Sequence, residues 1–424
     1  MSCFRSVPIG AVCLLYAALL SAAPVSPSSL APNTASAALR MAVSEVWLAS
    51  PELAAGSAER DAAHARALAA AQPLYNPSLL LESERADVDR HTVGIGLTLD
   101  LSGKRRARAG EGEAAEQVAQ WNHQLLRRDV AARWLKAWSM SIIVDRQLAL
   151  GQRRLTLMQR FDELAAQRLK VGDISSPERD LAGLALSEAQ WQQAAIAGDE
   201  AAARGALASV GGESGASLPE LPGELPPGAD DLVPMPIDEL PELRRAGALQ
   251  AGTEAAVRVA RRARIPDPQL SVTGGEVRSG PRTDRVVGIS LSIPLPVRNS
   301  GGAEVQAARA QADAAAATLH SSRFVLAARL QETRQRYAAL RAAAVAFRGS
   351  RASALDDRTS LLEKLWRAGE MGTSDYLVQL KQSLDTALAG QELESRVWQA
   401  WFDYLIAAGR LNDWLDGSTQ DISR

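Results

Sequence analysis

The chain has 424 residues, a formal net charge of −2 and an aromatic content of 4%. This near-neutral charge argues against a nucleic-acid partner, because nucleic-acid binding needs a basic surface. The apolar residues are mostly Ala and Leu, which favours long, closely packed helices over a large aromatic-rich core.

Residues 1–23 are typical of a secretory signal peptide, with Arg5 ahead of an apolar run that ends in small residues. Both cysteines, Cys3 and Cys13, lie in this segment, so the exported chain is expected to have no disulfide and no thiolate metal site. Whether Cys13 carries a lipid stays open. No later segment reaches the roughly 18 to 20 apolar residues of a membrane-spanning helix, so any entry into a membrane would use strands.

The rest of the chain is expected to be an internal duplication. Its landmarks recur about 190 residues apart, far beyond the roughly 20 to 50 residues of a solenoid repeat. We expect a first repeat over 24–210, a linker rich in Gly and Pro over 211–237, a second repeat over 238–412 and a tail over 413–424. The paired landmarks are Pro51-Glu52-Leu53 and Pro241-Glu242-Leu243, Asn76-Pro77 and Asp267-Pro268, Val93-Gly94-Ile95 and Val287-Gly288-Ile289, and Gly172-Asp173-Ile174 and Gly369-Glu370-Met371.

Each repeat is predicted to open with a moderate helix and then form a β-hairpin, over 77–101 and 268–296, where a proline ends the helix. The second strand of each hairpin alternates between apolar residues and small or polar ones, so that one face is wholly apolar. Such strands fit an outer-membrane barrel, and the alternative is a half-buried strand of a soluble sheet. The positions expected to face lipid are Val93, Ile95, Leu97, Leu99, Val287, Ile289, Leu291 and Ile293.

Four strands cannot close a barrel, because the smallest bacterial barrels have about eight. The barrel is therefore expected to be shared between chains, and a homotrimer would supply twelve strands. One departure is that the strands lack the Trp and Tyr expected at lipid interfaces, with only Tyr75 nearby.

A very long proline-free helix is predicted after each hairpin, from about Gly103 to Lys170 and from about Gly301 to Arg367. At 1.5 Å per residue each would run on the order of 100 Å, too long for a compact domain. Turns over 171–176 and 368–373 then reverse the chain into return helices, the first with Ser176 as its expected N-cap.

The remaining candidate sites are weak. The histidines are scattered, with no pair at helical spacing, and no nucleophile lies beside a base, so we expect neither a metal site, a cofactor nor an enzyme. The cations Lys104, Arg105, Arg106 and Arg108 at a helix start are either a solvated helix end or a contact with anionic lipid headgroups.

Five motifs follow one another along the chain: Asn76-Pro77-Ser78-Leu79, Leu99 to Arg106, Ile293 to Asn299, Arg367 to Met371 and Ala407 to Leu411. In this order they resemble the TolC-like outer membrane factor family, and the resemblance covers almost the whole mature chain. The Gly-Lys-Arg-Arg and Pro-Leu-Pro-Val-Arg-Asn forms look most like the cobalt-zinc-cadmium branch, which exports heavy metals.

The resemblance implies a mainly α fold with a small β part: a trimeric twelve-stranded β-barrel in the outer membrane of a Gram-negative bacterium, above a periplasmic α-helical barrel. It implies an exit duct for heavy-metal cations that works with a periplasmic adaptor and an inner-membrane RND transporter. A duct for drugs or other small molecules is the alternative within this architecture. A periplasmic coiled-coil adaptor is the rival from another class, although an adaptor needs one helical hairpin where this chain has two.

The resemblance also places the two glycine turns at the periplasmic tip, where the adaptor docks and the tunnel opens. Charged residues beside the turns are candidates for a gate, although the acids among them would also suit helix N-termini. The expected tip residues are Gly172, Asp173, Ile174, Ser175, Gly369, Glu370, Met371 and Gly372, and the candidate gate charges are Arg168, Asp180, Arg367 and Asp375.

Overall fold

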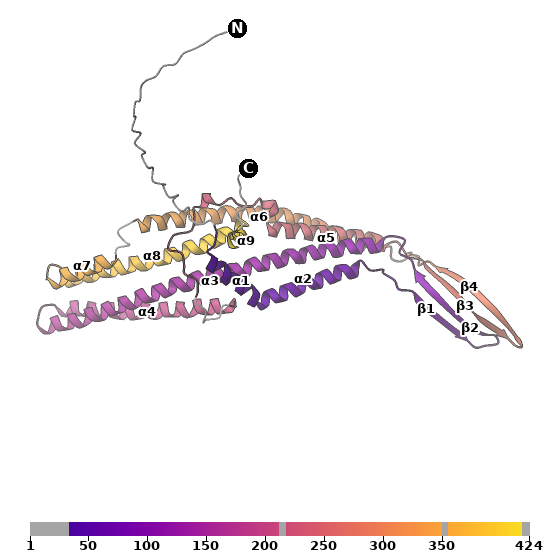
Figure 1. Ribbon diagram of the computed structural model, residues 1–424, viewed down its shortest axis with the longest axis horizontal. Coiled ribbons are helices and arrows are strands. Elements are labelled where there is room, and N and C mark those ends of the chain that lie inside the picture. The colour runs from indigo at the N-terminus through magenta and orange to yellow at the C-terminus, as the bar shows by residue number, and fades with distance from the viewer. Residues whose placement is uncertain (1–33, 212–217, 350–354, 418–424) are drawn as a thin grey trace, which may run out of the picture.

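The computed structural model describes residues 34–211, 218–349 and 355–417. They form a long rod with a four-stranded sheet at one end and two helix turns at the other (Figure 1). The expected signal peptide, with Cys13, and parts of the linker and tail lie outside the described residues.

The first repeat begins with α1 (Ala37–Ala49) and α2 (Pro51–Ala70). Ser50 separates them and caps α2, because its hydroxyl oxygen accepts a hydrogen bond from the Leu53 N–H at 3.4 Å. Proline at the first helical position has no N–H to leave unpaired. The matching Pro241 begins α5 (Pro241–Ala263) in the second repeat.

Both predicted hairpins are present and join into one antiparallel sheet of order β1-β2-β3-β4. The strands are β1 (Ser78–Glu84), β2 (Asp89–Thr98), β3 (Gln269–Ser279) and β4 (Arg282–Ser292). The strands are shorter than expected, so Leu99 and Ile293 lie just beyond them. The first hairpin ends early because the Asp100 carboxylate caps the helix that follows. The second ends early because Pro294 has no N–H to continue the ladder of backbone hydrogen bonds.

The first long helix is α3 (Lys104–Lys170), whose 67 residues run about 100 Å. The second is described in two parts, α6 (Gly302–Arg348) and α7 (Leu355–Arg367), and residues 350–354 between them lie outside the described residues. α6 ends at Gly349, a residue of low helix propensity. No helix in the described ranges is both long and apolar enough to cross a membrane.

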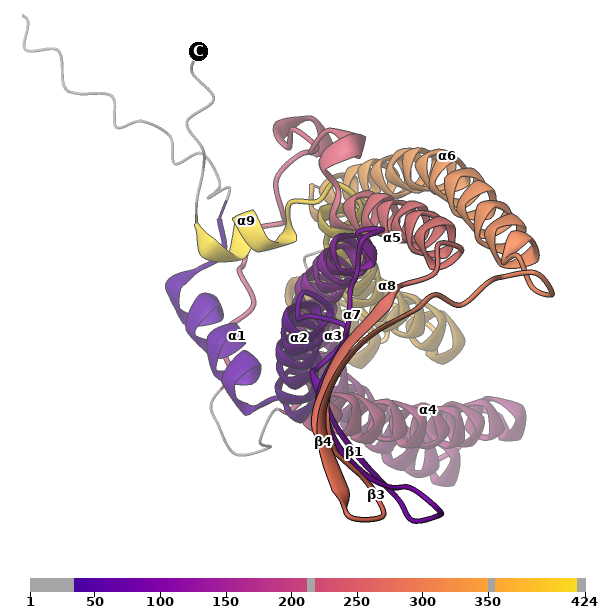
Figure 2. The same cartoon turned by 90° about the vertical axis from the view of Figure 1, so that its right-hand side faces the viewer.

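The return helices are α4 (Ser176–Ser209) and α8 (Thr373–Ala407). The second ends at Ala407, because Gly409 adopts a φ of 71° and turns the chain into α9 (Leu411–Asp416). Near the sheet the neighbouring helices run in the order α2, α3, α5, α6, and near the tip in the order α4, α3, α8, α7. Viewed along the rod, these elements form a curved wall (Figure 2).

The inter-repeat linker crosses the outside of the rod, with two short turns, η1 (Ala229–Asp231) and η2 (Ile237–Glu239). Its carbonyls accept hydrogen bonds from side chains of three helices: from Trp138 Nε1 to Pro219 (2.8 Å), from Arg341 Nε to Pro226 (2.7 Å) and from the Tyr404 hydroxyl to Ala229 (3.1 Å). The helix aromatics beneath it form the main core, with Trp138, Trp401 and Tyr404 almost fully buried.

Candidate functional site

One face of the sheet is apolar and exposed. Strand register places Leu79, Ile95, Val272 and Ile289 in one row across all four strands, and these side chains are between 48% and 75% exposed. A contiguous apolar surface of this kind marks an interaction site, since monomeric soluble proteins rarely expose one. The rows on either side continue it with Leu97, Leu270 and Leu291, and with Leu81, Val93 and Val287.

The opposite face carries small and polar residues. Thr273 lies between Gly94 and Gly288, and the Ser271 and Ser290 hydroxyls are 2.6 Å apart. A Cβ on Gly94 would stand only 2.5 Å from the Val272 carbonyl oxygen, so a larger residue there would push β2 and β3 apart. The predicted alternation is present, and lipid coverage of the apolar face stays a prediction.

Asp100 caps the start of α3. Its carboxylate accepts hydrogen bonds from the backbone N–H groups of Lys104 (2.9 Å) and Arg105 (2.8 Å). Burial alone would raise the pKa of Asp100, but these N–H donors lower it overall. The carboxylate thus supplies the negative charge that this helix end favours. Sequence analysis missed this role, although an acid just before a predicted helix start was a usable clue.

Asp267 ties the sheet to the helices. It accepts hydrogen bonds from the Tyr75 hydroxyl (2.6 Å) and Lys104 Nζ (2.7 Å), and its side chain is only 4% exposed. The bond to Asp267 is the main cause of a raised pKa of Tyr75. The strand junctions of the two repeats are therefore held by one buried carboxylate, a function that sequence analysis did not assign.

Both predicted tip turns have the same geometry. Gly172 and Gly369 adopt φ values of 83° and 76°. The Asp173 N–H donates to the Arg168 carbonyl (2.9 Å), and the Glu370 N–H donates to the Leu365 carbonyl (3.0 Å). This is the helix ending that favours glycine, because other residues are strained at positive φ. Of the eight expected tip residues, only Ile174 and Met371 are partly buried.

The N-cap of α4 is Ser175, so the prediction of Ser176 was wrong by one residue. The Ser175 N–H and hydroxyl both donate to the Glu178 carboxylate at 2.8 Å. These two bonds lower the pKa of Glu178. The reciprocal bond with Glu178 fixes the start of the helix at Ser176 rather than one residue later.

An aromatic cluster joins the two hairpins at the tip. Phe161 of α3, Trp366 of α7 and Tyr376 of α8 have ring centroids 4.8–5.5 Å apart. The Arg168 guanidinium lies over Trp366, 4.6 Å from the ring centroid. Sequence analysis missed this cluster, because its members belong to three helices far apart in the chain.

The candidate gate charges are not paired with one another within the chain. Arg168 stacks on Trp366, whereas Arg367 donates to Glu363 one turn earlier in its own helix at 2.5 Å. Asp180 and Asp375 are exposed near the starts of α4 and α8. Pairing of these charges between chains stays a prediction.

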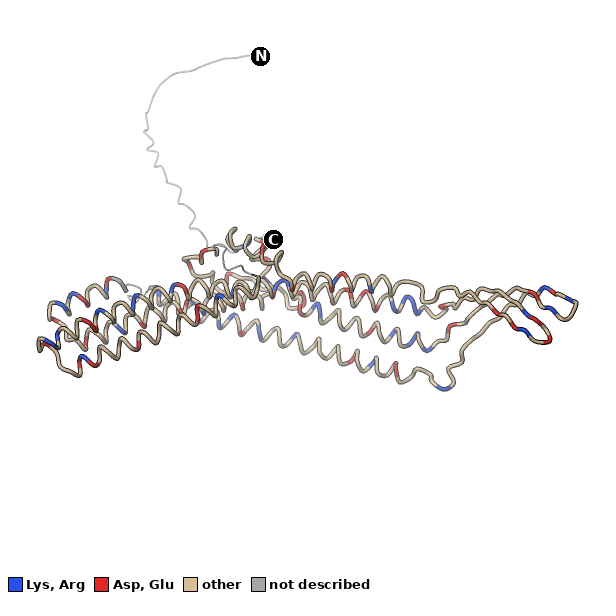
Figure 3. Tube along the Cα trace, turned by 90° about the horizontal axis from the view of Figure 1, so that it is seen from below, with Lys and Arg blue, Asp and Glu red and all other residues tan. Residues whose placement is uncertain are grey.

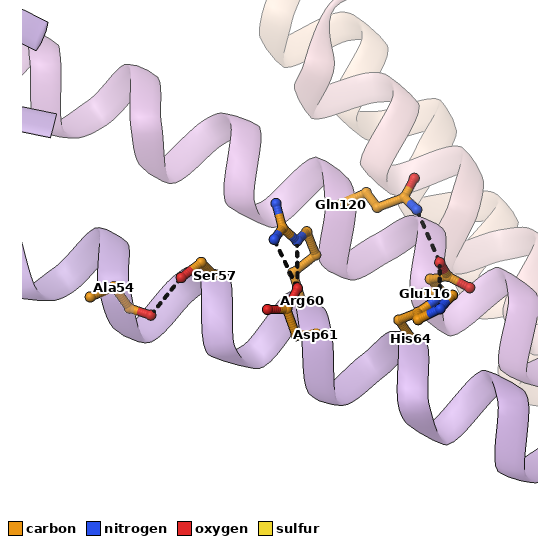
Figure 4. A network of polar contacts seen from close by, with 7 residues as sticks. All are labelled: Ala54, Ser57, Arg60, Asp61, His64, Glu116 and Gln120. Atoms are coloured by element: carbon orange, nitrogen blue, oxygen red, sulfur yellow. Dashed lines mark hydrogen bonds and ion pairs between the residues drawn. The ribbon is translucent and has the colours of Figure 1, made fainter. Parts of the chain in front are cut away.

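The histidines have ordinary surroundings. His64 Nδ1 lies 2.9 Å from Glu116 Oε1, and the Gln120 amide donates to the same oxygen (Figure 4). Burial is the main cause of a lowered pKa of His123. Within the described parts of the chain, no group of three or more His, Cys, Asp or Glu residues is arranged to hold a metal ion.

Comparison with known proteins finds two relatives in sequence. No family model matches the chain. The cobalt-zinc-cadmium resistance protein CzcC of Cupriavidus metallidurans is 25% identical over 288 residues, or 66% of this chain and 68% of CzcC. The nickel-cobalt-cadmium resistance protein NccC of Alcaligenes xylosoxydans xylosoxydans is 29% identical over 325 residues, or 73% of this chain and 70% of NccC.

The fold is also similar to that of a solved channel. It matches the Campylobacter jejuni CmeC outer membrane channel with a TM-score of 0.72 and 13% identity, over 88% of this chain and 86% of CmeC. The resemblance to the TolC-like outer membrane factors and the mainly helical fold with a small β part are thereby confirmed. The roles of the tip, gate and lipid-facing residues stay predictions.

Proposed function

We propose that this protein is the outer-membrane exit duct of a tripartite efflux pump for heavy-metal cations. The observation that carries the proposal is the exposed apolar face of the sheet, which lies at one end of a rod about 100 Å long. Sequence similarity to two metal-resistance proteins, CzcC and NccC, supports heavy-metal cations as the cargo.

The sheet and both helical layers have edges suited to closing a ring. The sheet ends in β1 and β4, the upper helices in α2 and α6, and the lower helices in α4 and α7. In every layer one edge comes from the first repeat and the other from the second. Joining the second-repeat edge of one chain to the first-repeat edge of the next is a head-to-tail contact that can close on itself. Three chains would supply the twelve strands of a barrel.

The helix edges also expose apolar side chains that such a contact would bury. Leu184 and Trp191 on α4 are exposed, as are Leu361 on α7, Leu68 on α2 and Phe324 on α6. Their burial between neighbouring chains would add to the pairing of the strand edges.

The tip would then dock a periplasmic adaptor that connects the duct to an inner-membrane RND transporter. We place adaptor contact on the exposed residues of the two glycine turns and a gate at the nearby charges. If Arg367 pairs with an acid of the next chain, Arg367→Ala should raise single-channel conductance in a planar bilayer, whereas Arg336→Ala, on the exposed surface of α6, should not.

Cysteine cross-linking tests the ring directly, because the chain's two cysteines both lie in its first 23 residues. A cysteine in place of Leu81 on β1, combined with one at Val287, Ile289 or Leu291 on β4, should give covalent trimers on oxidation in isolated outer membranes. A pair at Ile95 and Val272, which face each other within one sheet, should cross-link only within the chain. Monomers from every edge pair would contradict the ring.

Cargo is tested in the host by deleting the gene and restoring it. Loss of tolerance to cobalt, zinc and cadmium, with unchanged tolerance to drugs, is the expected result. The reverse pattern would favour the drug-duct alternative. Recovery of the protein in the soluble periplasm would favour the adaptor instead, although two strand hairpins and two helical hairpins in one chain argue against it.

A further inference from the structure

A pocket of about 550 Å³ lies where the sheet meets the helices. Its apolar lining includes Leu74 from the segment after α2, Leu97 from the end of β2, Leu99 just beyond that strand, and Ala109 from α3. Its charged lining is Asp100 together with Arg105 and Arg106 from the first turn of α3. A pocket that combines apolar residues with two cations matches a ligand with an apolar body and an anionic group.

The cations of this pocket are available to a ligand. Arg105 and Arg106 are exposed, and neither has an ion pair among the described residues. Asp100, which also lines the pocket, accepts hydrogen bonds from two backbone N–H groups, and Asp267 accepts bonds from Lys104 and Tyr75. Arg105 and Arg106 therefore line the pocket while both acids are engaged with other groups.

The pocket continues the apolar face of the sheet. Leu97 belongs both to the pocket lining and to the exposed row with Leu270 and Leu291. An acyl chain lying along that row would bring its headgroup to the end of β2, where the arginines begin. Guanidinium groups bind phosphate through paired N–H donors, and basic pockets at the membrane edge bind anionic headgroups.

We propose that this pocket binds the phosphate headgroup of an anionic phospholipid from the periplasmic leaflet, with the acyl chains on the apolar sheet face. The inference rests on the proposed function, because it needs the sheet to lie in a bilayer. Bound lipid would hold the junction of sheet and helices at a fixed depth, through the arginines on α3 and the leucines on β2.

The test is native mass spectrometry of the full-length protein in neutral detergent, titrated with phosphatidylglycerol, phosphatidylcholine or inorganic phosphate. The double variant Arg105→Gln/Arg106→Gln should bind phosphatidylglycerol more weakly, by roughly fivefold for each arginine removed. The matched control Arg329→Gln/Arg336→Gln removes the same charge from exposed positions of α6 and should bind as the parent does. Phosphatidylcholine should bind more weakly than phosphatidylglycerol to the parent.

Three results would overturn the inference. Unchanged phosphatidylglycerol binding in the double variant would exclude this pocket, and equal binding of both lipids would exclude recognition of charge. Binding of inorganic phosphate as tight as that of the lipid would mean a phosphate site without a lipid. If membrane trimers still form in these cases, the proposed function stands and only the lipid site fails; if the parent forms none, both fail.

Discussion

The two faces of the sheet can be tested with adjacent residues of one strand. Val272 and Thr273 are neighbours on β3 and lie on opposite faces. Val272 lies between Ile95 and Ile289, in the middle row of the apolar face, whereas Thr273 lies between two glycines on the small face. Replacing each in turn with arginine adds the same charge at neighbouring positions of one strand, but on opposite faces of the sheet.

The two variants are expected to differ greatly in folding stability if lipid covers the apolar face. An arginine at the bilayer midplane of a barrel costs about 2–4 kcal/mol, while lumen positions tolerate charge. Val272→Arg should therefore lower the ratio of folded to unfolded chain by roughly 30- to 900-fold. Thr273→Arg should change this ratio little, because Gly94 and Gly288 leave room for the longer side chain and this face would be in contact with water. On a soluble sheet both arginines would be solvated and cost little.

The assay is refolding of both variants into liposomes over a urea series, with heat-modifiable migration in gels reporting the folded trimer. We expect the unfolding transition of Val272→Arg at a much lower urea concentration than that of the parent protein, and the transition of Thr273→Arg close to that of the parent. Equal shifts for the two variants would refute the assigned faces, and a larger shift for Thr273→Arg would mean that the lipid and water sides are reversed.

The tip supplies three further predictions. Trp366→Ala removes the ring that contacts Phe161, Tyr376 and Arg168 and should cost about 3–5 kcal/mol, seen as faster hydrogen exchange at the tip with an unchanged sheet. Gly369→Trp should strain the positive-φ turn and abolish adaptor co-purification while trimers persist; a docked adaptor would show that the tip is misplaced. Burial raises the pKa of Tyr376 from 10.0 to about 12, so the neutral phenol stabilises the fold below pH 10 and that stability is lost between pH 10 and 12, by up to about 2 kcal/mol. Tyr376→Phe should remove this alkaline loss from thermal unfolding curves; an identical loss in both proteins would contradict it.

The features that sequence analysis predicted correctly have local causes. The alternation of Val93 and Ile95 with glycines has the period of a strand, and the helix turns require positive φ at Gly172 and Gly369. Each pattern occupies a few consecutive residues. It can therefore be recognised in the sequence without knowledge of the tertiary contacts.

The features that sequence analysis missed depend on contacts between distant segments. Asp267 and Lys104 are 163 residues apart, and the aromatic cluster of the tip draws on three helices. One sequence does not specify which of many acids meets which cation. The second long helix was predicted to run through Gly349, whereas α6 ends there, because glycine has a low helix propensity.

Lys, Arg, Asp and Glu residues lie along the helices as far as the tip end of the rod (Figure 3), and the contacts that join the two repeats differ between the two ends of the rod. In the sheet, a continuous ladder of backbone hydrogen bonds joins the repeats, with β2 paired to β3 over ten residues. Near the tip, side chains alone join them: Lys381 to Glu188 at 2.7 Å, Arg154 to Asp385 at 2.7 Å, and the aromatic cluster around Trp366. Side-chain contacts can exchange partners one at a time, whereas a ladder shifts only as a whole. The fold therefore combines a continuous sheet that resists change with a far end whose helices are joined by contacts that can separate.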